Sequence, residues 1–211
     1  MPFRSEKQRK WMHANEPEMA KEWEKEYQQG GYLEGNSHEF GGIPIFAEGG
    51  EFYFCPKDRV LFSGANRNSI KGAEEVASFL NVDELIIIET KAFHLDTVFT
   101  TVLDNNSHLC AVIVCKELVS EKSFDRLNRF ANETHNKIFN IPSHDAIGLN
   151  KNIGSLAVNN LSAPGLLISS SSFSNPELIK ELNNMNIKLE ISPVSQFQLS
   201  GGSIHCLTNE L

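Results

Sequence analysis

The sequence has no long hydrophobic run. Its longest apolar segments lie around Leu85–Ile88 and Leu109–Cys115, and both fall far short of the roughly 20 residues that a membrane-spanning helix needs. The first residues are charged rather than apolar, which is not the pattern of a secretory signal. We therefore expect no membrane association and a cytoplasmic location.

The chain is also short of basic residues. It has 19 Lys and Arg against 27 Asp and Glu among 211 residues, a formal net charge of −8. Nucleic acids attract basic surfaces, so no nucleic-acid partner is expected, whereas a cationic small molecule suits this charge. With 40 % hydrophobic and 22 % charged residues, the composition is that of a globular protein that can bury a core.

Cysteine is scarce, and its spacing argues against two kinds of site. The four cysteines stand at positions 55, 110, 115 and 206. On a strand, Cys110 and Cys115 would point to opposite faces, which suits neither a disulfide nor a zinc knuckle. No glycine-rich phosphate-binding fingerprint occurs either. The sequence therefore predicts free thiols, no metal site and no cofactor.

Composition divides the chain into three parts. Residues 1–28 are charged and helix-prone with a break near Pro17, which predicts a helical N-terminal arm. Residues 29–45 are rich in glycine and are interpreted as a linker. Residues 46–211 alternate short apolar runs with amphipathic stretches, so the globular domain is expected there.

Within residues 46–211 the pattern predicts an α/β domain of repeated ββαβ units. Helices are expected at Ile70–Leu80, Glu121–Glu133 and Asn175–Met185, the last with Asn175 as its cap and Pro176 in its first turn. One helix recurs among several strands, whereas a doubly wound sheet would alternate them one for one. The expected strands are Glu51–Cys55, Val60–Ser63, Leu85–Glu89, Val98–Leu103, Leu109–Cys115, Lys137–Ile141, Ser155–Val158, Gly165–Ser169 and Ile187–Ile191.

The final segment places Cys206 shortly after two glycines, Gly201 and Gly202. Paired glycines allow unusual backbone dihedrals, so this cysteine is expected at a tight turn rather than in a packed strand. A nucleophilic cysteine needs partial exposure and help to become a thiolate. On these residues alone, a catalytic and a structural cysteine stay equally open.

Three other clusters are each weak alone. His94 and Asp96 are two residues apart, so on a strand they would share a face; a proton-transfer group would then lie beside an anion that can hold a cation, although an ordinary surface strand explains the pair as well. Glu48 and Glu51 flank two glycines in an apparent turn. Arg67 lies in a loop that runs into a helix.

The order of these four clusters resembles the guanidine-modifying pentein superfamily. The most specific segments are His94-Leu-Asp-Thr-Val-Phe99 and Gly201-Gly-Ser-Ile-His-Cys-Leu207. Over residues 46–211 the chain is similar in particular to dimethylarginine dimethylaminohydrolases, with arginine deiminases and amidinotransferases nearby. The resemblance implies a propeller of five ββαβ modules with the site at its centre.

The resemblance also implies a reaction. Cys206 matches the family's nucleophile and His94 its general acid and base. The expected activity is cysteine-dependent hydrolysis of the guanidinium group of arginine or N-methylated arginine, through a covalent amidine-cysteine intermediate that gives citrulline.

Four further residues are expected to bind the substrate. Asp96 matches the carboxylate that grips the guanidinium, and Glu48 matches the acidic residue beside the histidine. Arg67 falls where the family binds the substrate carboxylate, although its loop is one residue shorter than the usual spacing. Glu51 stands where the family usually has aspartate.

The largest departure from the family precedes Glu48. Family members have roughly two further modules there, whereas residues 1–45 occupy that place in this sequence. We therefore expect a partial α/β propeller of about three modules with open sheet edges. A homo-oligomer, or another chain that completes the propeller, is the expected protein partner.

Residues 1–45 carry a resemblance of their own. Met1–Asn15 looks like the opening of small phage-encoded proteins, and Gly30–Pro44 is similar to a glycine-rich motif of phage structural proteins. The alternative function is accordingly a catalytically inactive pentein remnant that acts as a guanidino-binding or phage-associated structural protein.

Overall fold

The structure is a computed structural model that describes residues 17–18, 45–149 and 153–208. Within the described chain, every β-strand belongs to one compact unit formed by residues Ile45–Leu211. Apart from residues 17, 18 and 45, the expected helical arm (1–28) and linker (29–45) lie outside the described residues and stay predictions.

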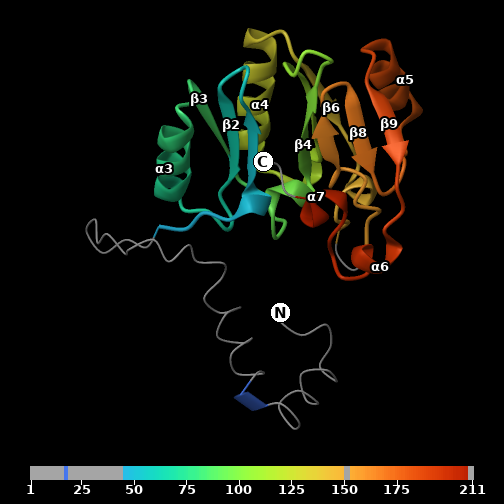
Figure 1. Cartoon of the computed structure of the whole chain (residues 1–211), viewed down its shortest axis with the longest axis horizontal. Helices are drawn as coiled ribbons and strands as arrows, with labels where there is room; N and C mark the ends of the chain where they lie inside the picture. The colour runs from blue at the N-terminus through green and yellow to red at the C-terminus, as the bar shows by residue number, and fades with distance from the viewer. Residues whose placement is uncertain (1–16, 19–44, 150–152, 209–211) are drawn as a thin grey trace. The chain divides into compact units, whose positions relative to one another are not determined.

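The unit consists of three successive ββαβ modules, which follow one another from left to right in Figure 1. Module 1 contains β1 (Phe52–Cys55), β2 (Val60–Gly64), α3 (Ile70–Leu80) and β3 (Glu84–Ile88). Module 2 contains β4 (Phe99–Leu103), β5 (Leu109–Val114), α4 (Glu121–Glu133) and β6 (Lys137–Asn140). Module 3 contains β7 (Leu161–Ala163), β8 (Leu166–Ser169), α5 (Pro176–Asn184) and β9 (Lys188–Ile191).

Each module repeats one topology. Its first two strands pair antiparallel, and its helix then crosses over to a third strand that pairs parallel with the second. Parallel neighbours need such a crossover because a short turn cannot join them. The expected partial propeller of three ββαβ modules is confirmed. Two short helical turns lie between modules, η2 (Leu95–Thr97) and η4 (Ser143–Asp145). Of the others, η1 (Gly49–Glu51) precedes module 1, η3 (Lys116–Leu118) lies inside module 2, and α6 (Ser195–Gln198) and α7 (Ile204–Leu207) follow module 3.

Side-chain caps explain why the three long helices begin where the sequence predicts. Ser69 and Ser120 each accept a hydrogen bond from the backbone N–H three residues later. Asn175 caps α5 by accepting from the Glu177 N–H, with Pro176 at the first helical position. Such caps satisfy backbone donors that have no partner inside the helix.

One predicted strand is wrong, and a short strand takes its place farther along the chain. Residues 155–158 form no strand, although Leu156, Ala157 and Val158 are fully buried. Leu156 adopts a positive φ of 54°, and its carbonyl accepts from the Asn159 N–H, which closes a tight turn. The apolar run therefore marked burial rather than extended backbone, and β7 begins only at Leu161.

Aromatic and helical contacts join the modules into one core. Phe62 of β2 is fully buried, with its ring centroid 5.1 Å from that of Phe99 on β4 and 5.5 Å from that of Phe130 on α4. Helix α4 thus packs against β3 of module 1 as well as against its own β6. Modules 2 and 3 meet where Thr100 donates a hydrogen bond of 3.1 Å to Asn160.

None of the helices within the described residues has both the length and the apolar character needed to cross a membrane.

We predict that Phe62→Ala lowers the free energy of unfolding by about 3–5 kcal/mol, because it leaves a cavity where modules 1 and 2 meet. Urea denaturation followed by circular dichroism measures the loss. Leu199→Ala is the control, since Leu199 is 73 % exposed and its truncation should change stability by no more than about 0.5 kcal/mol. Equal effects of the two substitutions would contradict the arrangement of the core.

Candidate active site

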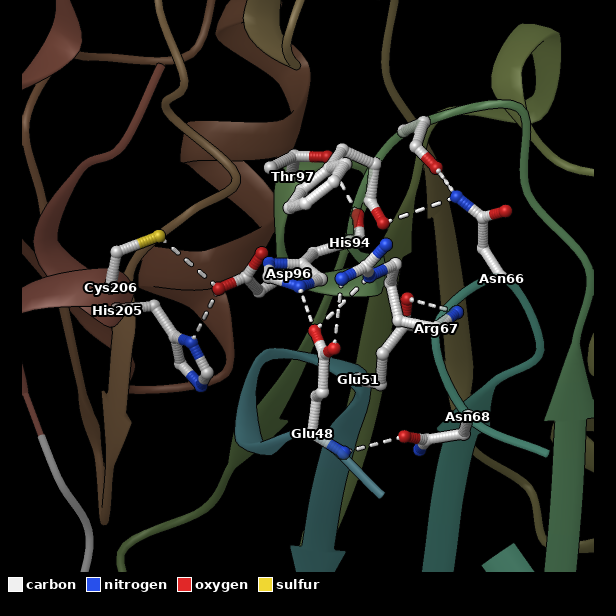
Figure 2. A network of polar contacts seen from close by, with 12 residues as sticks. Glu48, Glu51, Asn66, Arg67, Asn68, His94, Asp96, Thr97, His205 and Cys206 are labelled. Carbon is white, nitrogen blue, oxygen red and sulfur yellow. Dashed lines mark hydrogen bonds and ion pairs between the residues drawn. The ribbon is translucent and has the colours of Figure 1, made fainter. Parts of the chain in front are cut away.

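The candidate site forms where five segments of the chain meet (Figure 2). Glu48 precedes η1, Arg67 lies in the loop after β2, and His94 and Asp96 lie at η2. Asn159 follows the turn before β7, and α7 carries Cys206. Residues distant in sequence therefore converge on one place.

Asp96 is the centre of the site. Its side chain is almost fully buried, and its Oδ2 lies 3.0 Å from His205 Nδ1. The Cys206 thiol donates to the same oxygen at 3.3 Å. The second oxygen, Oδ1, is buried and has no hydrogen-bond partner. Because an unpaired buried carboxylate oxygen is costly, this atom is a ready acceptor for a donor from a ligand.

Asn159 fixes Cys206 beside Asp96. Its Nδ2 lies 3.0 Å from the backbone carbonyl oxygen of Asp96 and 3.3 Å from the cysteine sulfur, and its Oδ1 accepts from the Cys206 N–H at 3.3 Å. Neither Asn159 nor His205 was predicted from the sequence. His205 lies within the cysteine motif, whereas the only sign of Asn159 was an Asn-Asn pair after an apolar run.

A second group of contacts surrounds His94. Its Nε2 lies 2.8 Å from Glu48 Oε2, and Arg67 binds both oxygens of the same carboxylate, at 3.3 Å from Nε and 3.0 Å from Nη2. The Arg67 guanidinium also stacks 4.7 Å from the centroid of the Phe93 ring. Gly50 leaves the space beside the histidine open, since a Cβ there would lie 3.0 Å from His94 Nδ1 and 3.3 Å from Asp96 Oδ2.

Glu51 is fully buried beneath these residues. Its Oε1 accepts from the Arg67 backbone N–H at 3.2 Å, while its Oε2 has no hydrogen-bond partner. Gly64 makes room for this carboxyl group, because a Cβ at position 64 would come within 1.3 Å of Oε2. Burial raises the pKa of Glu51 to about 7.

The pKa values of Glu48 and of the Cys206 thiol are shifted in opposite directions. Burial raises the pKa of Glu48, but hydrogen bonds from Arg67 and His94 outweigh it and leave the pKa below its usual value. Cys206 is an exposed residue, but its sulfur faces Asp96 and Asn159. Burial of the sulfur, followed by the negative charge of Asp96, raises the pKa of this thiol. Without a ligand, the site therefore holds a thiol rather than a thiolate.

The structure brings the six residues singled out in the sequence into one connected region, but three placements differ from the simplest expectation. His94 and Asp96 lie at a short 3-10 helix, Leu95–Thr97, rather than on a strand. Arg67 binds Glu48 instead of standing alone in its loop. Glu51 is enclosed rather than directed toward open space.

Within the part of the chain that the structure describes, no three His, Cys, Asp or Glu side chains are grouped so that they could hold a metal ion. The acidic groups bind neighbouring side chains and backbone instead: Glu48 binds Arg67 and His94, Asp96 binds His205 and Cys206, and Glu51 accepts from the Arg67 backbone. The four cysteines, at positions 55, 110, 115 and 206, are free thiols.

We predict that Glu51 makes the protein less stable as pH rises. An unfolded chain loses this proton near the ordinary pKa of 4.5, whereas the folded chain keeps it until about 7. The folded state thus binds more protons between these values, so the free energy of unfolding falls as pH rises through this window, by up to ~1.4 kcal/mol per pH unit. Urea denaturation should show a flatter pH dependence for Glu51→Gln, while the exposed control Glu74→Gln keeps the wild-type slope; parallel slopes for all three proteins would contradict this.

We also predict that Asp96→Asn makes Cys206 more reactive. Removing the negative charge lowers the pKa of the neighbouring thiol, so a larger fraction is thiolate at neutral pH. Iodoacetamide should then label Cys206 several-fold faster, as peptide mass spectrometry can follow. Cys110, whose pKa burial raises to about 11, is the internal control and should label at an unchanged rate. Slower labelling of Cys206 would show that Asp96 does not suppress its ionisation.

Comparisons with known proteins find relatives by structure alone. No protein-family model matches the sequence, and no curated protein matches it significantly. Among solved structures, the chain is similar to the product-bound N-terminal domain of ArgZ, an arginine dihydrolase from the ornithine-ammonia cycle in cyanobacteria, with a TM-score of 0.62 and 19 % identity. That alignment covers 79 % of this chain and 57 % of the ArgZ domain.

Two other solved structures give the same result. Unliganded AgrE matches with a TM-score of 0.61 and 19 % identity, over 79 % of this chain and 23 % of AgrE. A dimethylarginine dimethylaminohydrolase, as an adduct with 4-chloro-2-hydroxymethylpyridine, matches with a TM-score of 0.53 and 16 % identity, over 78 % of this chain and 57 % of that enzyme. No match supports the resemblance of residues 1–45 to phage proteins.

The chain thus spans less than three fifths of the length of these structures. At such low identity, the likeness shows a shared fold. Together with the three modules described above, it shows that residues 45–149 and 153–208 have a partial pentein fold.

Proposed function

We propose that this site binds a guanidinium group and hydrolyses it through Cys206, with arginine or N-methylated arginine as the substrate. The observation that supports the proposal most strongly is the unpaired, buried Oδ1 of Asp96, the carboxylate whose Oδ2 accepts from the Cys206 thiol. A guanidinium ion offers several N–H donors in one plane and a positive charge. It would therefore satisfy this oxygen and place its central carbon near the sulfur.

The charges of the site favour a cation. Asp96 and Glu48 are acidic, and the Arg67 guanidinium is held by Glu48. The side chain of Arg67 is 38 % exposed, so we propose that it also binds the substrate carboxylate. Glu51 holds the Arg67 backbone in place by accepting a hydrogen bond from its N–H.

Substrate binding also activates the nucleophile. In the free site Asp96 opposes ionisation of the Cys206 thiol. A bound guanidinium neutralises Asp96 and adds a positive charge beside the sulfur, and both effects lower the pKa of the thiol. The thiolate then forms only when there is a substrate to attack.

The proposed reaction has two stages. In the first, the thiolate forms a C–S bond to the central guanidinium carbon; the C–N bond to the leaving group then breaks, its electron pair stays on nitrogen, and His94 supplies a proton. Ammonia leaves from arginine, or dimethylamine from dimethylarginine. In the second, water gives one proton to His94 and bonds to the same carbon, the C–S bond breaks with its electron pair on sulfur, and the remaining hydroxyl proton passes to solvent, which leaves citrulline and the thiolate. Glu48 orients His94 through the 2.8 Å contact at Nε2.

A second candidate function is binding of a guanidino compound without turnover. Two observations favour it: the pKa of the Cys206 thiol is raised in the free site, and the chain spans only 57 % of the ArgZ domain that it matches. The same Asp96 oxygen would hold the ligand, and the sulfur would stay a thiol.

We predict that the purified protein forms citrulline from arginine or dimethylarginine, measured together with the released amine. Cys206→Ser should abolish product, and His94→Gln should reduce the rate by about 10²–10⁴-fold because it cannot transfer the proton. Asp96→Asn should also lose turnover, although its thiol labels faster, because the guanidinium loses its anchor.

Cys110→Ser is the matched control, because Cys110 lies on β5 outside the site, and it should keep full activity. If the wild-type protein forms no product but 2-chloroacetamidine labels Cys206 selectively and arginine protects it, binding without turnover is correct. If neither product nor selective labelling occurs, both functions are refuted.

A further inference from the structure

The modules join by one repeated pattern of charge. The sixth residue of α4, Arg126, pairs with Glu84, the first residue of β3 in the preceding module. The sixth residue of α5, Glu181, pairs in the same way with Lys137, the first residue of β6. At both junctions within the described chain, a helix thus meets the last strand of the module before it through opposite charges.

The junction between modules 1 and 2 is also sealed by an apolar contact. Phe130, the tenth residue of α4, is 1 % exposed and packs on Phe62 of the preceding module. In the strands that these helices cover, Val60 and Phe62 of β2 and their counterparts Ala111 and Ile113 of β5 are all buried. The junction between modules 1 and 2 therefore combines an ion pair with a buried apolar contact.

Helix α3 of module 1 presents the same elements without a partner. Its sixth residue is Glu75, which is exposed and forms no ion pair with any other described residue. Its tenth residue is Phe79, which corresponds to Phe130 but is 88 % exposed. The helix thus offers an acid and an aromatic ring where its counterparts in modules 2 and 3 meet a neighbouring module.

Module 3 presents the complementary half at the opposite side of the unit (Figure 1). The first residue of β9 is Lys188, whose side chain is 73 % exposed. On β8, Leu166 and Ile168 take the places of Val60 and Phe62 and are only partly buried. The strand face therefore offers a basic group beside apolar side chains, whereas α3 offers an acid and an aromatic ring.

From this match we propose that α3 of one copy docks on β8 and β9 of a second copy of this chain. Glu75 then pairs with Lys188, and Phe79 covers Leu166 and Ile168. A second copy is the occupant because this chain itself supplies both halves of the junction, with opposite charges at equivalent positions. The interface is heterologous, so two copies joined at both ends would form a closed pair, whereas copies joined at one end would form short arrays.

Nothing on the strand face opposes this docking strongly. Lys188 already pairs with Glu190 on the same strand, but that ion pair is exposed, and exposed pairs stabilise little. The ammonium group has three donors, so it can bind Glu190 and the incoming Glu75 together. Burial of the Phe79 ring supplies most of the attraction.

The test measures self-association of the full chain by analytical ultracentrifugation over a range of micromolar concentrations. The wild-type protein is expected to associate. Glu75→Lys, which places two lysines at the junction, and Lys188→Glu, which places two acids there, should each weaken association at least about tenfold in Kd, as should Phe79→Ala. A mixture of Glu75→Lys with Lys188→Glu restores opposite charges across the junction and should associate, and so should the double variant.

Matched charge reversals next to the proposed interface are the controls. Glu74→Lys on α3 and Lys180→Glu on α5 change the net charge in the same way and should associate as the wild type does. Circular dichroism of every variant checks that it is folded. A monomeric wild type, equal weakening by the control variants, or failure of the mixture and the double variant to associate would each overturn the proposal. None of these measurements depends on activity at Cys206.

Discussion

The carboxylate of Asp96 joins parts of the molecule that the sequence separates by more than a hundred residues. One of its oxygens binds both His205 and Cys206, at separations of 109 and 110 positions, and its backbone carbonyl binds Asn159. The last described turn of helix is therefore attached to the start of module 2 by this side chain, together with Asn159. A buried carboxylate needs hydrogen-bond partners. His205 and Cys206 supply them for Oδ2, whereas Oδ1 has none and is open to a ligand.

The repeated module explains both the fold and its exposed ends. Each helix packs against the last strand of its own module, and α4 also packs against β3 of the preceding module. Helix α5 meets β6 of the preceding module through the ion pair between Glu181 and Lys137. A helix between two modules buries two of its faces, whereas a helix at the end of the array leaves one face uncovered. Phe79 of α3 is accordingly exposed, while the equivalent Phe130 of α4 is buried. The residues exposed at the edges of the unit are thus the ones that would be buried at a junction between two modules.

Local signals in the sequence predicted the fold well. Helices Ile70–Leu80 and Glu121–Glu133 have the predicted bounds, because a serine cap and an amphipathic period are both local. Residues 155–158 were misassigned, since an apolar run does not distinguish a buried turn from a strand. The clustering of the site residues was expected from the order of their motifs, but the bond between Arg67 and Glu48 and the burial of Glu51 beneath Gly64 were not. Those contacts depend on how separate loops stack, which no single stretch of sequence specifies.

Helix α7 is a single turn, Ile204–Leu207, held at the site by Asn159 and Asp96. So short a helix has little stability of its own, whereas the Phe62 cluster stabilises the modules independently of it. Local opening of α7 therefore needs much less free energy than global unfolding. On mild heating, the contacts around the Cys206 thiol should be lost before the sheets unfold. Native-state hydrogen exchange should therefore be faster at the Cys206 amide than at the amides of β5.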